Sequence, residues 1–392
     1  MLACSYASRC SGCDWLLLTE AEQKERKISD LRAHIAGCAP REVIDNIEFV
    51  SISEGGLRDR VDLLLDNRTG SPRLGLFDRF KTGVVDLEGC PQLSPKLEAW
   101  LGGFRRLKIL SDSAPVSIQR GSVRLRVSPE GRPGVWLDFA NIDIKRLLEE
   151  GTILREMLAA CTVEVGQRRK RLFINDSDQL KLSDPVLETW FETYHASEAG
   201  TGPGLSIPLY CTIGSFTQPG FFANRALVST ALKFVKESGA RRVMEFGSGI
   251  GNFTLPLAGL CDRVDAYEVD TLALKGLRLA AERTGVVVDE RLHIHEGNFQ
   301  IARKEALSFE NADLVFVDPP RSGLMKFLDP LGNLAQERRP KHFLYVSCFA
   351  ESFSADARRL TALGYRAQTV AIVDQFPQSR HYEIVAMFTA RY

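Results

Sequence analysis

Hydrophobic and polar positions follow two different periods in the first half of this chain. Between residues 14 and 37, Ile28, Leu31 and Ile35 recur near helical spacing, which predicts one helix over this segment. From about residue 43 to residue 213, short alternating runs such as RVDLLLD and SVRLRVSP are separated by Gly, Pro, Asp and Asn. This alternation predicts a β-rich domain, with one helix inside it over the segment IKRLLEEGTILREMLA.

Beyond about residue 214 the period changes again, because amphipathic helical segments alternate with short apolar strands. Such alternation is typical of an α/β domain with a mostly parallel, doubly wound sheet. The last two apolar segments, RAQTVAIVDQF and HYEIVAMFTA, have no long crossover between them, so one of them is expected to run antiparallel. We therefore divide the chain into a β-rich domain over 1–213 and an α/β domain over 214–392.

The composition fits a globular protein of two or three domains. The 392 residues include 50 Lys and Arg against 50 Asp and Glu, which excludes a chain that binds nucleic acid through overall positive charge. Zero net charge does not exclude a local basic groove that binds nucleic acid. No segment reaches the roughly 18 apolar residues of a membrane span, and the first residues lack the basic and apolar regions of a signal peptide. We expect a cytoplasmic protein.

Three cysteines are clustered at the start of the chain, where Cys4, Cys10 and Cys13 form a C-x5-C-x2-C pattern. A fourth, Cys90, is followed by proline, and the odd total of nine cysteines argues against a disulfide framework. Soft thiolate ligands at such spacing are typical of a zinc site or an iron–sulfur cluster, and the spacing does not separate the two. Chance clustering of reduced thiols is the alternative.

A glycine-rich turn, EFGSGIG, follows the first strand of the α/β domain. Glycines at this position let a ligand approach the backbone, and Glu268, at the end of the next strand, can accept hydrogen bonds from the hydroxyls of a ribose. Asn252 stands where a dinucleotide fingerprint would have its third glycine. S-adenosylmethionine is therefore favoured over a dinucleotide, and an ordinary tight turn is the alternative.

Two later strands end in reactive side chains, Asp318 in VDPPR and Cys348 in YVSC. Because ligands bind at the carboxyl ends of strands in open parallel sheets, both residues are expected at the cofactor site. A cysteine in such a cleft suits an activated thiolate, although a single cysteine is more often a buried core residue. The basic run RRKR at 168–171 is either a solvated face or an edge that contacts phosphates.

Several segments that carry these residues follow one another in a characteristic order. They are the cysteine cluster with Cys90, GLRDRVDLLL, LGLFDRF, GCPQLSP, SFTQPG, EFGSGIGNFTLPLA, VDPPRSG, YVSC and FPQSRHYE. Through them the chain resembles the RNA uracil-C5 methyltransferases over nearly its whole length. With no domain before Cys4, it is most similar to the RlmC-like 23S rRNA branch, which lacks an N-terminal β-barrel (TRAM) module.

The resemblance implies a class I (Rossmann-like) S-adenosylmethionine-dependent methyltransferase domain beside the β-rich domain, in a monomer that binds RNA and no membrane. It implies Cys348 as the nucleophile and Glu383 as the base. It implies a [4Fe-4S] cluster on Cys4, Cys10, Cys13 and Cys90. The contacts to S-adenosylmethionine that it implies are Gln218, Gly247, Asn252, Glu268, Asn298 and Asp318.

Four positions depart from the pattern of this family. Glu245 stands where aspartate is usual, and Gly247 stands where an aromatic residue is usual. Gly220 and Phe349 each stand where asparagine is usual.

The chemistry of C5 methylation requires one cysteine and one base. Uracil C5 is a poor nucleophile, but a thiolate that adds to C6 makes an enolate whose C5 can attack a methyl sulfonium. A carboxylate must then remove the C5 proton so that the thiol can leave. The target base must also leave its stack, which favours a loop or a flipped nucleotide. The resemblance to the 23S rRNA branch implies 23S rRNA as the substrate.

Three other functions stay open on the sequence. A tRNA uracil-C5 methyltransferase would use the same residues on another RNA. An amino-group methyltransferase would carry an aromatic residue after its Asp-Pro-Pro motif, where Arg321 stands, and would leave Cys348 idle. An RNA-binding protein with a structural zinc site and an inactive methyltransferase domain would bind no S-adenosylmethionine.

Overall fold

The computed structural model describes residues 2–68, 70–111, 120–139, 144–195, 205–297 and 309–391. The chain forms two compact units. The first consists of Met1–Thr19, Ser53–Phe191 and Cys211–Phe221, and the second of Glu20–Ile52, Glu192–Tyr210 and Phe222–Tyr392. The sequence-based division between residues 213 and 214 differs from these units chiefly in two segments, 20–52 and 192–210.

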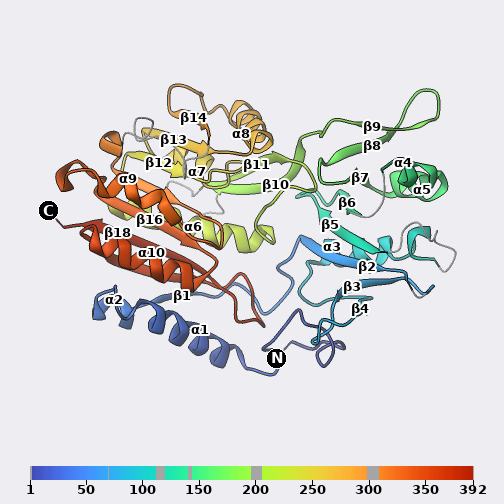
Figure 1. Ribbon diagram of the computed structural model, residues 1–392, viewed down its shortest axis with the longest axis horizontal. Coiled ribbons are helices and arrows are strands. Elements are labelled where there is room, and N and C mark those ends of the chain that lie inside the picture. The colour runs from blue at the N-terminus through green and yellow to red at the C-terminus, as the bar shows by residue number, and fades with distance from the viewer. Residues whose placement is uncertain are drawn as a thin grey trace. The chain divides into compact units, whose positions relative to one another are not determined.

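The second unit is built on an eight-stranded sheet with the order β1-β17-β18-β16-β15-β12-β13-β14 (Figure 1). Its strands are β1 (Glu48–Val50), β12 (Arg242–Phe246), β13 (Arg263–Glu268), β14 (Leu292–Glu296), β15 (Leu314–Val317), β16 (His342–Ser347), β17 (Tyr365–Val373) and β18 (Glu383–Ala390). Neighbouring strands run parallel, except that β18 runs antiparallel to both β16 and β17. This confirms the mostly parallel sheet and the antiparallel closing strand.

Helices pack on this sheet. They are α1 (Glu20–Ile35), α2 (Arg41–Asp45), α6 (Phe221–Ser238), α7 (Thr254–Leu260), α8 (Thr271–Thr284), α9 (Leu328–Gly332) and α10 (Ala350–Ala362). The N-terminal helix α1 lies beside α10, near the other end of the chain (Figure 1). Ser354 Oγ donates a hydrogen bond of 2.6 Å to the carbonyl oxygen of His34, and Leu31 shares one buried apolar cluster with Phe353.

The strand β1 explains why the segment 20–52 belongs to the second unit. Its residues pair in parallel with β17, so that Glu48 lies opposite Ala371 and Val50 opposite Val373. The sequence-based division at residue 213 places this stretch in the β-rich domain, which is wrong. A strand of three residues carries too little pattern to indicate which sheet it joins.

The first unit confirms the β-rich region, with an eight-stranded sheet of order β4-β3-β2-β5-β6-β7-β8-β9. Its strands are β2 (Arg60–Asp66), β3 (Arg73–Phe77), β4 (Val84–Asp86), β5 (Arg120–Val127), β6 (Pro133–Asp138), β7 (Thr162–Val165), β8 (Lys170–Ile174) and β9 (Leu180–Ser183). Only β6 and β7 pair in parallel among these strands. A separate ribbon joins β10 (Glu188–His195) to β11 (Leu205–Cys211).

The helices α1, α3, α4 and α5 show where helical patterns succeed and fail; α1 belongs to the second unit and the other three to the first. The helix predicted over 14–37 forms as α1, but the single helix predicted over IKRLLEEGTILREMLA is wrong. The chain there forms α4 (Ile144–Glu149) and α5 (Gly151–Ala160), because Glu150 leaves helical geometry at ψ 47°. A further helix, α3 (Pro95–Phe104), was not predicted; its N-cap Ser94 accepts a hydrogen bond from the Leu97 amide.

Within the described ranges, no helix has both the length and the apolar character needed to cross a lipid bilayer.

Candidate active site

Cys348 and Glu383 lie at adjoining ends of two neighbouring strands in the sheet of the second unit. Cys348 comes directly after β16, and Glu383 is the first residue of β18. The strand β16 ends at Ser347, and the antiparallel register sets Ser347 opposite Ile384 in β18. Continued by one residue, this register sets Cys348 opposite Glu383, and opposed residues of an antiparallel pair lie on the same face of a sheet. The turn after β16 is closed by Ser347, whose Oγ donates to the carbonyl of Phe349 and accepts from its amide.

The two residues belong to one electrostatic cluster with Asp318 and Arg321. Glu383 is only 3% exposed, and burial raises its pKa well above the ordinary range, with a further increase from the charge of Asp318. Burial raises the pKa of Asp318 to about 7. Burial also raises the pKa of the Cys348 thiol, and the carboxyls of Glu383 and Asp318 raise it further. These charges and the burial therefore favour the thiol form of Cys348 over the thiolate.

Arg321 is the functional candidate whose role the sequence analysis misses. Its guanidinium lowers the pKa of Cys348, against burial and the two carboxyls, and also that of Glu383. The loop that carries it is fixed by Asp356, whose Oδ2 accepts hydrogen bonds from the amide of Leu324 at 2.7 Å and the hydroxyl of Tyr345 at 2.9 Å. Its position after Asp-Pro-Pro was the available signal.

The glycine turn after β12 is bound to the end of β13. The amide of Gly249 donates a hydrogen bond of 2.9 Å to Glu268, whose other carboxylate oxygen accepts from the amide of Val269 at 2.7 Å. Gly247 has φ +85°, and a Cβ atom there would lie 3.1 Å from the carbonyl oxygen of Asp318. The aromatic residue that is usual at this position would be strained here, so the departure at Gly247 follows from the local backbone.

Glu245 adds a further carboxyl at the same edge of the sheet. It is 1% exposed, and its Oε2 has no hydrogen-bond partner among the described residues. Burial raises its pKa to about 8, with further contributions from the charges of Asp318 and Glu268. Glu245, Glu268 and Asp318 stand at the carboxyl ends of β12, β13 and β15, and Glu383 stands at the start of antiparallel β18. Four carboxyls at one edge suit a positively charged ligand.

Asn252 is bound within the second unit. Its side-chain amide exchanges two hydrogen bonds of 2.8 Å with the amide of Asn224, and its carbonyl accepts a hydrogen bond of 2.6 Å from the hydroxyl of Thr193. Its predicted contact to the cofactor stays a prediction. Asn298 lies outside the described residues.

Gln218 belongs to the first unit, next to a loop whose backbone is held firmly. Arg60, Arg124 and Arg126 donate hydrogen bonds of 2.7–3.1 Å to carbonyl oxygens of the loop 212–217. A Cβ atom at Gly220 would lie 1.8 Å from the carbonyl oxygen of Leu57, so the asparagine that is usual there does not fit. The contact of Gln218 to the cofactor stays a prediction, because the residue lies in the other unit.

The four cysteines of the predicted cluster affect one another's ionisation in the first unit. Burial, together with the charges of Cys90, Cys10 and Cys4, raises the pKa of Cys13 to about 12. All nine cysteines are free thiols. Among the described residues, no three Cys, His, Asp or Glu side chains are already gathered around a common metal position. The mutual effect on ionisation shows that the four thiols lie near one another. The role of Cys4, Cys10, Cys13 and Cys90 as metal ligands stays a prediction.

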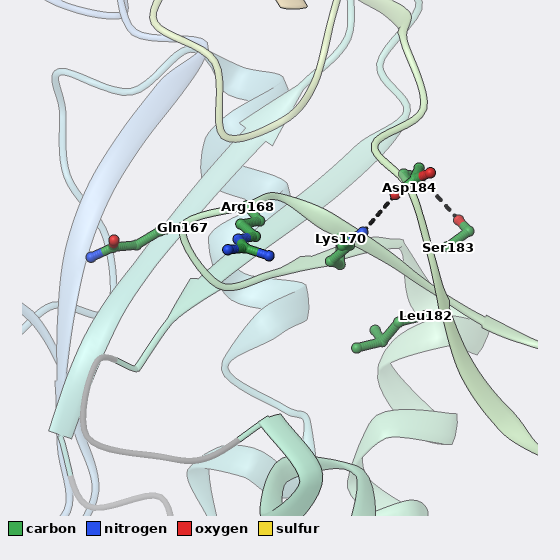
Figure 2. A pocket seen from close by; sticks show the side chains of 6 residues that line it. All are labelled: Gln167, Arg168, Lys170, Leu182, Ser183 and Asp184. Atoms are coloured by element: carbon green, nitrogen blue, oxygen red, sulfur yellow. Dashed lines mark hydrogen bonds and ion pairs between the residues drawn. The ribbon is translucent and has the colours of Figure 1, made fainter.

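In the basic run at 168–171, three side chains are bound and Arg168 is available; Figure 2 shows Arg168 and Lys170 of this run. Lys170 pairs with Asp184 at 2.5 Å, and Arg171 pairs with Glu188 at 2.8 Å. The guanidinium of Arg169 donates to the hydroxyl of Ser215. Arg168 lines an open depression of about 690 Å³ with Gln167 and Lys170, and no carboxylate of the described residues pairs with it.

The chain is similar to known proteins over most of its length. The family model described as tRNA (Uracil-5-)-methyltransferase matches residues 209–391. A protein of Bdellovibrio bacteriovorus named as an uncharacterized RNA methyltransferase is 39% identical, over 98% of this chain and 94% of its own length. The 23S rRNA (uracil(747)-C(5))-methyltransferase of Yersinia pestis is 26% identical, over 98% of each chain.

Among solved structures, the chain is similar to the Pyrococcus abyssi tRNA (uracil-54, C5)-methyltransferase in complex with S-adenosyl-L-homocysteine. The TM-score is 0.64 at 20% identity, over 97% of this chain and 86% of the other. This likeness shows a class I methyltransferase fold with an additional β-rich N-terminal region.

The electrostatic cluster predicts how the Cys348 thiol titrates. Its alkylation by iodoacetamide, followed by mass spectrometry of the peptide that carries it, should have a midpoint pH above that of an ordinary thiol, because burial and two carboxyls oppose the thiolate. Glu383→Gln removes one neighbouring negative charge and should lower the midpoint by about one pH unit. Arg321→Gln removes the opposing positive charge and should raise it.

The exposed Glu337 offers a matched control, since Glu337→Gln makes the same charge change away from this cluster and should leave the midpoint where it is. A midpoint that Glu383→Gln also leaves unchanged would contradict the proximity of the two groups.

Proposed function

Because the chain belongs to the family of S-adenosylmethionine-dependent RNA uracil-C5 methyltransferases, we propose that it methylates a uridine of 23S rRNA with Cys348 as nucleophile and Glu383 as base. The observation that carries the assignment of residues is the β16–β18 register, which sets Cys348 opposite Glu383. The relative from Yersinia pestis, named for 23S rRNA, matches this chain over 98% of both lengths and favours that RNA. A tRNA uridine is the second candidate, because the matching family model is named for tRNA enzymes.

The proposed reaction begins and ends at Cys348. Its thiolate adds to C6 of the uracil, the C5–C6 double bond opens, and C5 gains nucleophilic character as part of an enolate. S-adenosylmethionine supplies a methyl group on a positively charged sulfur: C5 bonds to the methyl carbon, the bond from that carbon to sulfur breaks, and the sulfur leaves as a neutral thioether. Glu383 then removes the proton from C5, the double bond reforms, and the bond from Sγ to C6 breaks. The sulfur leaves as the thiolate with which the cycle began.

The charges of the site fit this sequence. Arg321 stabilises the thiolate that the first step requires, against the burial and the carboxyls that favour the thiol. The raised pKa of Glu383 makes it a stronger base than an ordinary carboxylate, as the last step requires. A cationic cofactor would be held by Glu245, Glu268 and Asp318, and Glu245 keeps one oxygen without a partner in the described structure.

The donor set of the four cysteines fits a [4Fe-4S] cluster, which we include in the proposal. Cys4, Cys10 and Cys13 come from one short segment and Cys90 from a loop of the same unit. The negative charge of each thiolate opposes that of its neighbours, as for Cys13 and Cys90, so a cation is needed to hold all four deprotonated. The cluster would supply that charge and fix the N-terminal segment to the β-rich sheet.

The proposed nucleophile and base predict opposite fates for the covalent adduct. With transcripts of the organism's own 23S rRNA and tRNA genes, wild-type enzyme should methylate uridine at C5 and release the RNA. Glu383→Gln should transfer one methyl group and then hold the methylated RNA in a complex that resists denaturant, because elimination needs the C5 proton removed. Cys348→Ala should form no complex with these RNAs or with their 5-fluorouridine forms.

The methylated nucleotide, mapped by mass spectrometry, identifies the RNA. A denaturant-resistant complex that still forms with Cys348→Ala would refute the nucleophile, and methylation of tRNA alone would move the substrate to the second candidate.

The cluster predicts iron in the purified protein. Anaerobically purified enzyme should hold about four iron atoms per chain with broad visible absorption, and Cys90→Ser should lower both. Cys161 serves as the matched control, since it is a half-buried thiol of the same unit outside the set of four. Cys161→Ser should keep the iron, whereas stoichiometric zinc without iron in the wild type would overturn the assignment.

The pairing within the basic run predicts that Arg168 contributes more to RNA affinity than its neighbours. Arg168→Ala should weaken binding and lower the slope of log affinity against log salt by about one, the share of one phosphate contact. The double variant Lys170→Ala with Asp184→Ala removes an existing ion pair at constant net charge and should leave the slope unchanged. Equal slopes for Arg168→Ala and wild type would assign the run to a solvated face.

A further inference from the structure

Three polar residues of helix α1 bind the loop that leads into Glu383. The loop runs from Asp374, directly after β17, to Tyr382, directly before Glu383 and β18. The contacts come from Gln23, Lys27 and Asp30 of the helix. Residues at this spacing lie on one face of a helix, so a single face reaches the loop at three points.

The contacts of Lys27 fix the beginning of the loop, and the contacts of Gln23 fix its middle. Lys27 Nζ donates to Asp374 Oδ1 at 2.7 Å and to the carbonyl of Phe376 at 3.1 Å. Gln23 and Gln378 exchange two hydrogen bonds, in which the Gln23 amide donates at 2.9 Å and its oxygen accepts from the Gln378 backbone at 2.8 Å. Gln378 has φ +66°, an uncommon conformation for a residue with a side chain.

The third contact lies next to the proposed base. The hydroxyl of Tyr382 donates a hydrogen bond of 2.6 Å to Asp30 Oδ2, and Tyr382 is the residue before Glu383. Tyr382 is 5% exposed, so its ring is packed as well as bonded. The direction in which the chain enters β18, and with it the position of the Glu383 carboxyl, is thus set from α1.

Stability alone does not account for this arrangement. Lys27 is fully buried, at 0% exposure, among the apolar residues by which α1 joins the core. A buried ion pair commonly contributes less to stability than apolar side chains of similar volume would, whereas removal of one partner is costly. Burial lowers the pKa of Lys27 and raises that of Asp374, and each charge opposes the other's shift. What the pair provides is one defined conformation of the loop.

We propose that Lys27 and Tyr382 are positioning residues for proton removal, through which α1 holds the carboxyl of Glu383 at C5 of the methylated uracil. This inference rests on the proposed role of Glu383. It separates the two halves of the reaction. Addition of Cys348 and methyl transfer do not use the base, and elimination does.

The test measures methyl transfer and elimination separately, in single turnovers with unmodified RNA transcribed from the 23S rRNA and tRNA genes. Lys27→Met should keep the rate of methyl transfer and the KM for S-adenosylmethionine within about twofold of wild type. Its elimination should slow about tenfold, because small displacements of a base cost that much, so methylated RNA should accumulate as the covalent adduct. Tyr382→Phe, which keeps the ring, should show the same pattern with a smaller effect.

Arg32→Gln is the matched control, because Arg32 lies on the same helix and donates to the carbonyl of Ile44. It should leave both rates unchanged. In a Glu383→Gln background, Lys27→Met should add nothing to the elimination defect, since both changes act on one group. Equal losses of methyl transfer and elimination in Lys27→Met would show a merely structural role and overturn the proposal.

Should Lys27→Met fail to fold, Tyr382→Phe decides, and elimination as fast as that of Arg32→Gln would overturn the proposal. Failure of the proposed function is distinguishable from this outcome. In that case wild-type enzyme makes no 5-methyluridine or forms no adduct, whereas failure of the inference leaves wild type active and the Glu383→Gln adduct intact.

Discussion

The antiparallel pairing of β18 with β16 is the constraint on which the candidate site depends. In a parallel sheet, the beginning of a strand and the end of its neighbour lie at opposite edges. Because β18 is antiparallel to β16, its first residue, Glu383, lies at the edge of the sheet where β16 ends and Cys348 follows. The nucleophile can therefore follow one strand and the base can open the next, although the two residues are separated by a helix, a strand and a loop.

Four carboxyl groups lie at the same edge of the sheet, and the positive charge of Arg321 balances their negative charge only in part. Glu245, Glu268 and Asp318 arrive there because parallel strands end together, and Glu383 arrives because its strand is reversed. Burial raises the pKa of Asp318 to about 7, and burial together with the charges of Asp318 and Glu268 raises that of Glu245 to about 8, so protons on these carboxyls limit the repulsion at this edge. Arg321 is the positive charge that acts on both Cys348 and Glu383. A cationic ligand that enters this site would take over the role of the protons.

The sequence predicts those features that repeat or that fall within one short segment. The alternation of helices and strands beyond residue 214 predicts the parallel sheet, and two apolar segments without a crossover predict its reversed strand. Motifs at strand ends place Asp318 and Cys348 at one edge, because topology alone brings strand ends together. The residue Glu383 needed the family resemblance, since a carboxylate at the start of a strand has no distinctive pattern.

Features that depend on distant partners could not be predicted in this way. The three residues of β1 do not indicate that they pair with β17, and Glu150 does not show by its type that it interrupts a helix. The charge of Arg321 was visible, but its contact with Cys348 follows from how Asp356 holds the intervening loop. The asparagine missing at Gly220 is explained only by the carbonyl of Leu57, which no local pattern reveals.

The buried polar residues of helix α1 are the clearest example of contacts that the local sequence does not predict. Its apolar residues predict a helix that packs on a core, but by that criterion Lys27 and Gln23 belong to its solvated side. They are buried because Asp374 and Gln378, 347 and 355 residues away, meet them there. Such contacts join segments far apart in the sequence, and bringing such distant segments together costs chain entropy. The shape of the loop before Glu383 is therefore a property of the folded second unit, which no local pattern around Glu383 contains.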